Sequence, residues 1–142
     1  MKVQIMRKEM FKIDFLDHVA IRVRDMEASV NWYERVLGLK TYRLKEWDPF
    51  PIFLMAGQTG IALFPAHLDD ASIPMKSLNV KIDHFAFRVD NDNFKKAQKH
   101  LQAEGIVFEL KDHTYYHSLY MTDPDGHTVE LTTLVVDESD FF

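Results

Sequence analysis

A seven-residue motif occurs twice in the chain, and this repeat constrains the fold more than any other feature. DHVAIRV begins at Asp17, and DHFAFRV begins at Asp83, sixty-six residues later. Side chains alternate between the two faces of an extended strand. In each copy the histidine, His18 or His84, therefore lies on one face with an alanine and an arginine, and the opposite face is apolar. The repeat predicts two equivalent strands, each with one face to be covered.

A helix is predicted after each copy of the motif. In DMEASVNWYERVLG, Asp25 is suited to the N-cap and Gly38 to the position that ends the helix. In NDNFKKAQKHLQAEG, Gly105 ends the second helix. Three strand candidates follow each helix: TYRLKE, PIFLMA and GIALFP in the first half, and IVFEL, SLYMT and HTVELTTL in the second. Each half is therefore predicted to fold as βαβββ.

The predicted fold class is α+β, with two tandem βαβββ modules. We expect the modules to form one curved eight-stranded mixed sheet, with the helices outside and a metal-binding cleft inside. The predicted domain spans residues 14–136, with modules at about 14–66 and 80–136. A tail, 1–13, precedes it, and an acidic tail, 137–142, follows.

Composition excludes several classes of protein. The net charge is −5, whereas nucleic-acid binding requires a basic patch. The chain has no cysteine, which excludes disulfides and thiolate ligands. No apolar run approaches the roughly 20 residues of a membrane helix, and the basic start MKVQIMRKEMFKIDF lacks the apolar core of a signal peptide. We expect a cytoplasmic protein that binds neither nucleic acid nor membranes.

Three side chains on the non-apolar strand faces form a candidate metal site. In HTVELTT, Val129 and Leu131 share one face, and Glu130 lies on the other. Together with His18 and His84, Glu130 completes the donor set of a facial triad, which holds a divalent metal and leaves coordination positions open. The alternative is that these histidines are ordinary hydrogen-bonded or surface residues, which is the commoner role of a histidine on a sheet.

The segments DHVAIRVRDMEASVNWYERVLGL, DHFAFRV and DPDGHTVEL together resemble the vicinal oxygen chelate superfamily over about residues 14 to 135. That superfamily includes glyoxalase I, type I extradiol dioxygenases, fosfomycin-resistance enzymes and bleomycin-resistance proteins. The resemblance implies that His18, His84 and Glu130 are the metal ligands. It also implies a metal that chelates neighbouring substrate oxygens, a small-molecule substrate and a homodimer.

Departures from the family pattern separate its branches. Glyoxalase I takes a fourth ligand from the last strand of the first half, but GIALFPA offers no such side chain. Bleomycin-binding relatives lack the metal triad. Fosfomycin-resistance enzymes use the triad, but they surround a phosphonate with cationic and hydroxyl groups, whereas KDHTYYHSLYMTDPDG is aromatic and rich in histidine.

That segment more closely resembles the signature of type I extradiol dioxygenases, in which a His, an apolar-Tyr pair and Asp-Pro-x-Gly precede the ligand Glu. The resemblance implies catalytic roles for His113 and Tyr120, with His117 as an alternative to His113. It also suggests His67 as an acid–base residue. The metal implied first is Fe(II), with Mn, Zn or Ni as alternatives.

The leading hypothesis is thus a metal-dependent, dioxygenase-like enzyme that acts on a small catechol-type aromatic. The first alternative is a glyoxalase-like lyase or isomerase, or a fosfomycin-resistance-type transferase, on the same metal. The second is a non-catalytic small-molecule binding protein of the bleomycin-resistance type.

Overall fold

The computed structural model describes residues 10–66 and 80–142. The chain divides into two compact units. The first-module unit comprises Leu16–Asp83 together with Asp123–His127. The second-module unit comprises His84–Thr122 and Thr128–Phe142, and the N-terminal Met1–Phe15 is grouped with it.

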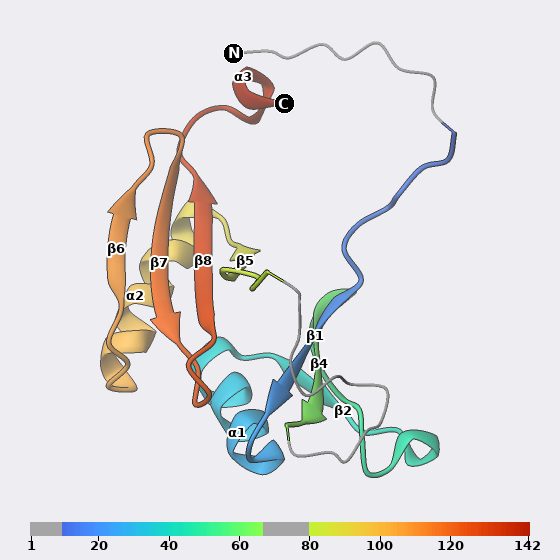
Figure 1. The fold of residues 1–142 in the computed structure, drawn as a ribbon. Helices are drawn as coiled ribbons and strands as arrows, with labels where there is room; N and C mark the ends of the chain where they lie inside the picture. Colours follow the sequence, from blue (N-terminus) through green and yellow to red (C-terminus); the bar gives the residue numbers. More distant parts are fainter. Residues whose placement is uncertain (1–9, 67–79) are drawn as a thin grey trace. The chain divides into compact units, whose positions relative to one another are not determined.

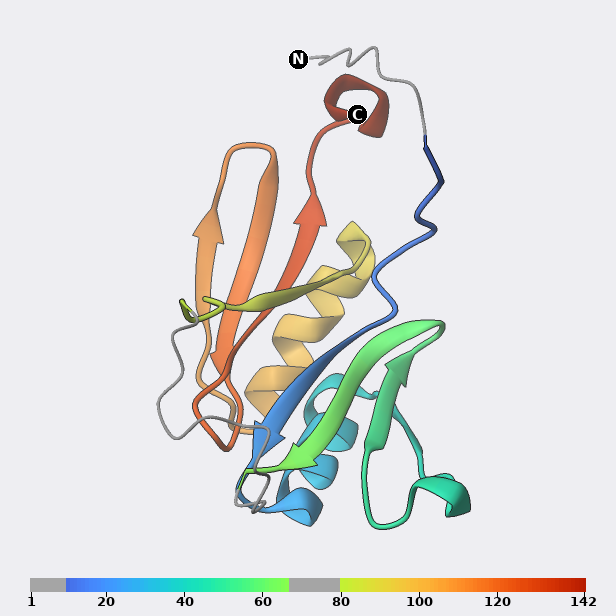
Figure 2. The same cartoon turned by 45° about the vertical axis from the view of Figure 1, so that its right-hand side comes forward.

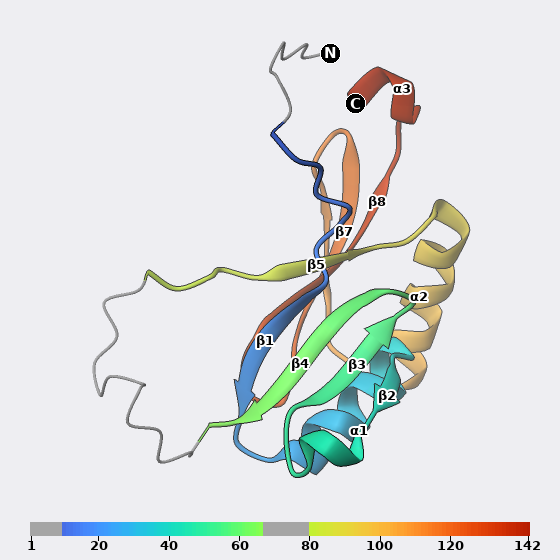
Figure 3. The ribbon, with the colours of Figure 1, turned by 90° about the vertical axis from the view of Figure 1, so that its right-hand side faces the viewer.

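The first-module unit is a four-stranded sheet with one helix on one face (Figure 3). Its elements are β1 His18–Val23, α1 Met26–Leu37, β2 Lys40–Tyr42, the 3₁₀ helix η1 Lys45–Trp47, β3 Ile52–Ala56 and β4 Thr59–Pro65. The strand order is β1-β4-β3-β2, with β1 parallel to β4 and the other pairs antiparallel.

The second-module unit repeats this plan, with α2 behind the β6, β7 and β8 strands (Figures 1 and 2). Its elements are β5 Phe85–Arg88, α2 Asn91–Ala103, β6 Glu109–Asp112, β7 Tyr116–Thr122, β8 Thr128–Leu134 and the short helix α3 Glu138–Phe141. The order β5-β8-β7-β6 matches that of the first unit, again with one parallel pair, β5 with β8.

The helix termini form as the sequence predicts. The Asp25 side chain accepts a hydrogen bond from the Ala28 amide at 3.0 Å. Gly38 adopts φ 66° and Gly105 adopts φ 69°, a left-handed conformation that costs glycine little and ends a helix cleanly. The apolar stripe of α1 is buried, with Tyr33 0% exposed and Val30 3%.

The βαβββ prediction is confirmed for both modules, with four differences in detail. The strands hydrogen-bond as two four-stranded sheets, whereas a single sheet of eight was expected. The strand predicted from TYRLKE ends at Tyr42, because the next residues turn into η1. The strand predicted from IVFEL begins only at Glu109, and the acidic tail contains α3, where the Phe141 ring lies 5.3 Å from that of Tyr116.

Within the described ranges, 10–66 and 80–142, the structure contains no helix whose length and apolar character would let it cross a membrane.

Candidate functional site

The second-module unit brings an imidazole and a carboxylate together beside β5 and β8. His84 Nε2 lies 2.9 Å from Glu130 Oε1. Glu130 is only 7% exposed, and its other oxygen accepts a hydrogen bond from Ser118 Oγ at 2.7 Å. Both carboxylate oxygens are therefore oriented by neighbours, which a buried charge requires.

This pair has the chemistry and spacing of two metal ligands. Metal–nitrogen and metal–oxygen bonds to ions such as Zn²⁺ are about 2.0–2.2 Å long. Two ligand atoms at roughly right angles on one such ion are then about 3 Å apart, close to the observed 2.9 Å between His84 Nε2 and Glu130 Oε1. The Ser118 hydroxyl corresponds to the outer hydrogen bond that fixes a ligating carboxylate.

Tyr120 and His113 lie next to the pair. Tyr120 is directly opposite Glu130 in the β7–β8 register, and its ring centroid is 5.7 Å from that of His84. The Tyr120 hydroxyl is 2.9 Å from His113 Nε2. The structure thus groups two of the three residues predicted to be catalytic with two of the three predicted ligands.

Lys111 adds a positive charge to the same face of the sheet. Lys111 is paired with Ser118 in the β6–β7 register, and its Nζ lies 5.5 Å from the centroid of the Tyr120 ring. The Ser118 hydroxyl is also 3.1 Å from Thr132 Oγ1. Lys111, which also lies 3.7 Å from Glu109 Oε1, and several hydroxyl groups are therefore on the same sheet face as the His84–Glu130 pair. Lys111 was not among the site residues predicted from the sequence.

His18 belongs to the first-module unit. Its Nδ1 lies 2.7 Å from Asp17 Oδ2. A carboxylate on Nδ1 orients the ring and leaves Nε2 as the ligating nitrogen, an arrangement common among metal-binding histidines. Asp17 was missed as a supporting residue, although the repeated Asp-His pair was a visible signal.

Aromatic side chains lie beside His18 in this unit. The Phe53 ring centroid is 5.0 Å from that of His18 and 5.0 Å from that of Trp47. On β4, Ala62 occupies the position that Glu130 holds on β8, since each pairs with the alanine of its repeat, Ala20 or Ala86. Ala62 is 0% exposed and apolar, so this position offers no fourth ligand of the glyoxalase I kind.

The Asp-Pro-Asp-Gly turn between β7 and β8 packs with α1 in the first-module unit. Asp123 is 6% exposed and accepts a hydrogen bond from the Tyr33 hydroxyl at 2.7 Å. Burial, together with this bond to the Asp123 carboxylate, raises the pKa of Tyr33 far above its ordinary value. Asp125 Oδ1 accepts from the Arg24 backbone amide at 2.9 Å. Residues far away in the sequence thus hold this turn. Asp123, its first residue, lies seven residues before Glu130.

The proposed interchange of His117 with His113 is wrong. His117 lies three residues before Tyr120 on β7, and so on the opposite face. It lines a hollow beside α2 instead. His67 lies outside the described residues, so its role stays a prediction. Within the described ranges, no three His, Asp or Glu side chains are grouped as a ready metal cluster, and the His18 ligand assignment also stays a prediction.

A family model for the Glyoxalase/Bleomycin resistance protein/Dioxygenase superfamily matches residues 15–131. The chain belongs to this superfamily. It is 30% identical over 127 residues to the metallothiol transferase FosB of Staphylococcus saprophyticus, covering 85% of this chain and 78% of that enzyme. It is 27% identical over 116 residues to the glutathione transferase FosA of Serratia marcescens, covering 82% and 78%.

Among solved structures, an integron cassette protein of V. cholerae superposes with a TM-score of 0.65 at 27% identity, over 88% of this chain and 98% of that one. The superfamily predicted from the sequence is thus confirmed. The names of the two enzymes describe transfer to or from a thiol, which corresponds to the alternative reading rather than to the dioxygenase. A specific likeness to extradiol dioxygenases is not shown.

Proposed function

We propose that this chain is a divalent-metal-dependent transferase that joins a thiol to a small anionic electrophile, as fosfomycin-resistance enzymes do. One observation carries the proposal. The His84–Glu130 pair lies on the same sheet face as Lys111, whose Nζ is also 3.7 Å from Glu109 Oε1, and as several hydroxyl groups. Such a set suits a phosphonate or a similar anion better than a neutral catechol. The likeness to FosB and FosA supports the same branch.

In this proposal His18, His84 and Glu130 hold the metal, which when bound supplies a Lewis acid for a substrate oxygen. The two imidazoles and one carboxylate suit a borderline divalent ion such as Mn²⁺, Zn²⁺ or Ni²⁺, and also Fe²⁺. Asp17 orients the His18 ring through its 2.7 Å contact with Nδ1, and Ser118 orients Glu130 through its 2.7 Å bond to Oε2.

The remaining polar groups of this face bind and orient the anion. Lys111 provides the positive charge, and the Tyr120 hydroxyl provides a donor whose direction is fixed by His113 at 2.9 Å. Donors held in place before the reaction stabilise developing charge without reorganisation.

The direct test is adduct formation. Purified protein loaded in turn with Mn²⁺, Zn²⁺, Ni²⁺ and Fe²⁺ is incubated with fosfomycin and either glutathione or L-cysteine, and the products are followed by phosphorus NMR and mass spectrometry. We expect a metal-dependent product whose mass is the sum of fosfomycin and the thiol. Absence of this product with every metal and both thiols would contradict the proposal for this substrate pair.

Replacing Tyr120 by phenylalanine should slow adduct formation by roughly 10–1000-fold, the range for one donor aimed at developing charge. The metal content should not change, because Tyr120 is not among the proposed ligands. Tyr116→Phe on the same strand is the matched control, since the Tyr116 ring packs against Phe141. Equal rates for the two variants would show that the Tyr120 hydroxyl takes no part.

Replacing Lys111 by methionine should raise KM for the anionic substrate about tenfold and change kcat little, because the lysine acts on the charge of the bound anion. Lys96→Met on α2, a lysine that is also exposed, controls for a general loss of charge. A KM equal to that of the unchanged protein would remove Lys111 from the substrate site.

Ring cleavage is the second candidate function, and the His113–Tyr120 contact at 2.9 Å favours it. Anaerobic loading with Fe²⁺, followed by measurement of oxygen uptake over a panel of catechols, tests it directly. Uptake with a yellow ring-opened product would favour the dioxygenase. If neither adduct formation nor oxygen uptake occurs, but a small molecule binds tightly, the non-catalytic binding protein is favoured.

A further inference from the structure

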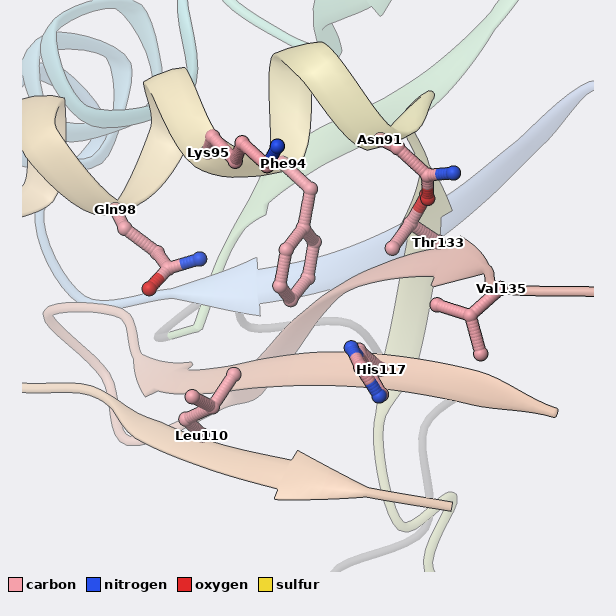
Figure 4. A pocket seen from close by; sticks show the side chains of 8 residues that line it. All are labelled: Asn91, Phe94, Lys95, Gln98, Leu110, His117, Thr133 and Val135. Atoms are coloured by element: carbon pink, nitrogen blue, oxygen red, sulfur yellow. The ribbon is translucent and has the colours of Figure 1, made fainter. Parts of the chain in front are cut away.

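A hollow lies on the α2 side of the second-module sheet, the face opposite to Tyr120. Its volume is about 330 Å³, at the lower end of the range for small-molecule sites. It is lined by Asn91, Phe94, Lys95, Gln98, Leu110, His117, Thr133 and Val135. Figure 4 shows Phe94 pointing from α2 toward the strands, with Leu110 and His117 across from it.

The sequence repeat explains why this space is open. Aligned on their N-caps, Asp25 and Asp90, the two helices match in their buried positions, since Val36 and Leu101 correspond and are 2% and 1% exposed. In the same alignment Lys95 replaces Val30 and Gln98 replaces Tyr33.

Val30 and Tyr33 are buried in the first module, at 3% and 0% exposed. In the second module, two polar side chains at the matching positions leave the space between helix and sheet unfilled. The same difference shows in the packing, because α1 lies against β2, β3 and β4, whereas α2 lies chiefly against β8.

The donors of the hollow come from one stripe of α2. Asn91, Lys95 and Gln98 are spaced four and three residues apart, so they lie on one face of the helix. The Thr133 hydroxyl donates to Asn91 Oδ1 at 2.9 Å, which directs the amide nitrogen of Asn91 toward a further acceptor. Lys95 adds a positive charge, and within residues 10–66 and 80–142 neither Lys95 nor Gln98 has a hydrogen-bond or ion-pair partner.

Apolar side chains form the rest of the lining. Phe94, Leu110 and Val135 provide surface for a hydrocarbon group. An acidic group, Asp112, lies beside this lining, with its Oδ1 3.6 Å from His117 Nε2. A ligand anion is therefore favoured on the Lys95 side of the hollow, and the Asp112 carboxylate disfavours it on the His117 side. The His117 ring forms part of the lining there.

We propose that this hollow is a second binding site, distinct from the His84–Glu130 face, for a small organic acid that carries one carboxylate and a compact apolar body. The carboxylate binds to Lys95 and to the amides of Asn91 and Gln98. The apolar body packs against Phe94, Leu110 and Val135. The site does not depend on the proposed reaction, because it shares no residue with the predicted metal ligands.

Benzoate is the probe, and benzamide is its neutral match in shape. Titration of the ¹⁵N-labelled full chain with each is followed by amide chemical shifts. We expect benzoate to bind with a Kd on the order of 1 mM, as suits so small a ligand, and to shift Leu110, His117 and Val135. Benzamide should bind at least fivefold more weakly. The titration extends to about 20 mM, roughly twenty times the expected Kd. Absence of binding up to that concentration, or equal binding of benzamide, would overturn the proposal.

Lys95→Met should weaken benzoate about fivefold and leave benzamide unchanged, whereas Lys99→Met, a lysine on the same helix outside the lining, should change neither. Gln98→Tyr, which restores the first-module residue, should fill the hollow and abolish binding. Shifts centred on His84 and Tyr120 in place of the α2 face, or unchanged benzoate affinity in Lys95→Met, would also overturn it.

Discussion

Alanine in place of His84 or Glu130 should reduce the affinity for divalent metal by more than 100-fold. Loss of an outer hydrogen bond to a ligand typically costs 10–100-fold in metal affinity, and loss of the ligand itself must cost more. His84 Nε2 and Glu130 Oε1 are 2.9 Å apart, as two ligands of one ion would be, and each variant removes one of these two donor atoms. Calorimetric titration with Mn²⁺ and Zn²⁺, together with metal analysis of the purified variants, measures the effect.

His18→Ala should lower metal affinity to a similar extent, and this variant tests the ligand that the resemblance assigns to the first-module unit. His117→Ala is the matched control, because it removes an imidazole from the opposite face of β7. Ser118→Ala should show a smaller loss, near 10-fold, because it removes only the bond that orients Glu130. Full metal affinity in any one of the three ligand variants would exclude that residue from the set.

The face of each site residue followed from the sequence, because the side-chain period of a strand is two. Alternation correctly separated Glu130 from Val129 and Leu131, which are buried on the α2 side. The same rule, applied to β7, excludes His117 from the face of Tyr120, since a shift of an odd number of residues changes the face. His117 was predicted as an alternative to His113 because the two residues lie close together in the sequence.

The position of Lys111 and the hydrogen bonds around Glu130 could not be predicted, because they depend on the register of the strands, which the sequence did not provide. The predicted strand IVFEL ended before Lys111, whereas β6 extends from Glu109 to Asp112. Only the β6–β7 pairing places Lys111 beside Ser118. The prediction of the superfamily branch therefore rested on residue types alone. It did not take into account the positive charge of Lys111.

The role of Asp123 could not be predicted either. Asp-Pro-Asp-Gly is a turn signal, and by itself it predicts only a turn before Glu130. The partner of Asp123 is Tyr33, ninety residues earlier in the chain. Neither periodicity nor local turn chemistry identifies a contact at that separation, although a tyrosine on the apolar stripe of α1 needs a partner for its hydroxyl.

Asp123→Ala should lower the free energy of unfolding by about 3 kcal/mol, which is more than a 100-fold change in the folding equilibrium. The alanine leaves the buried Tyr33 hydroxyl without its acceptor, along with the backbone amides of Asp125 and His127, which donate to Asp123 Oδ1 at 2.9 and 2.8 Å. Urea unfolding followed by circular dichroism measures the change. Asp137→Ala is the control, since Asp137 also accepts a backbone hydrogen bond but is fully exposed. Equal stability of the two variants would contradict the assigned role.

Tyr33→Phe isolates the hydroxyl and gives the contact a pH signature. The folded protein holds the pKa of Tyr33 far above its ordinary value of about 10, through burial first and the bond to Asp123 second. Above pH 10 the unfolded chain therefore releases a proton that the folded chain keeps. Stability from this group is complete below pH 10 and falls above it, by about 1.4 kcal/mol per pH unit. The difference in unfolding free energy between the unchanged protein and Tyr33→Phe should be constant from pH 7 to 9 and then decrease with this slope. A difference that stays constant through pH 11 would show that the Tyr33 hydroxyl ionises as readily in the folded protein as in the unfolded chain.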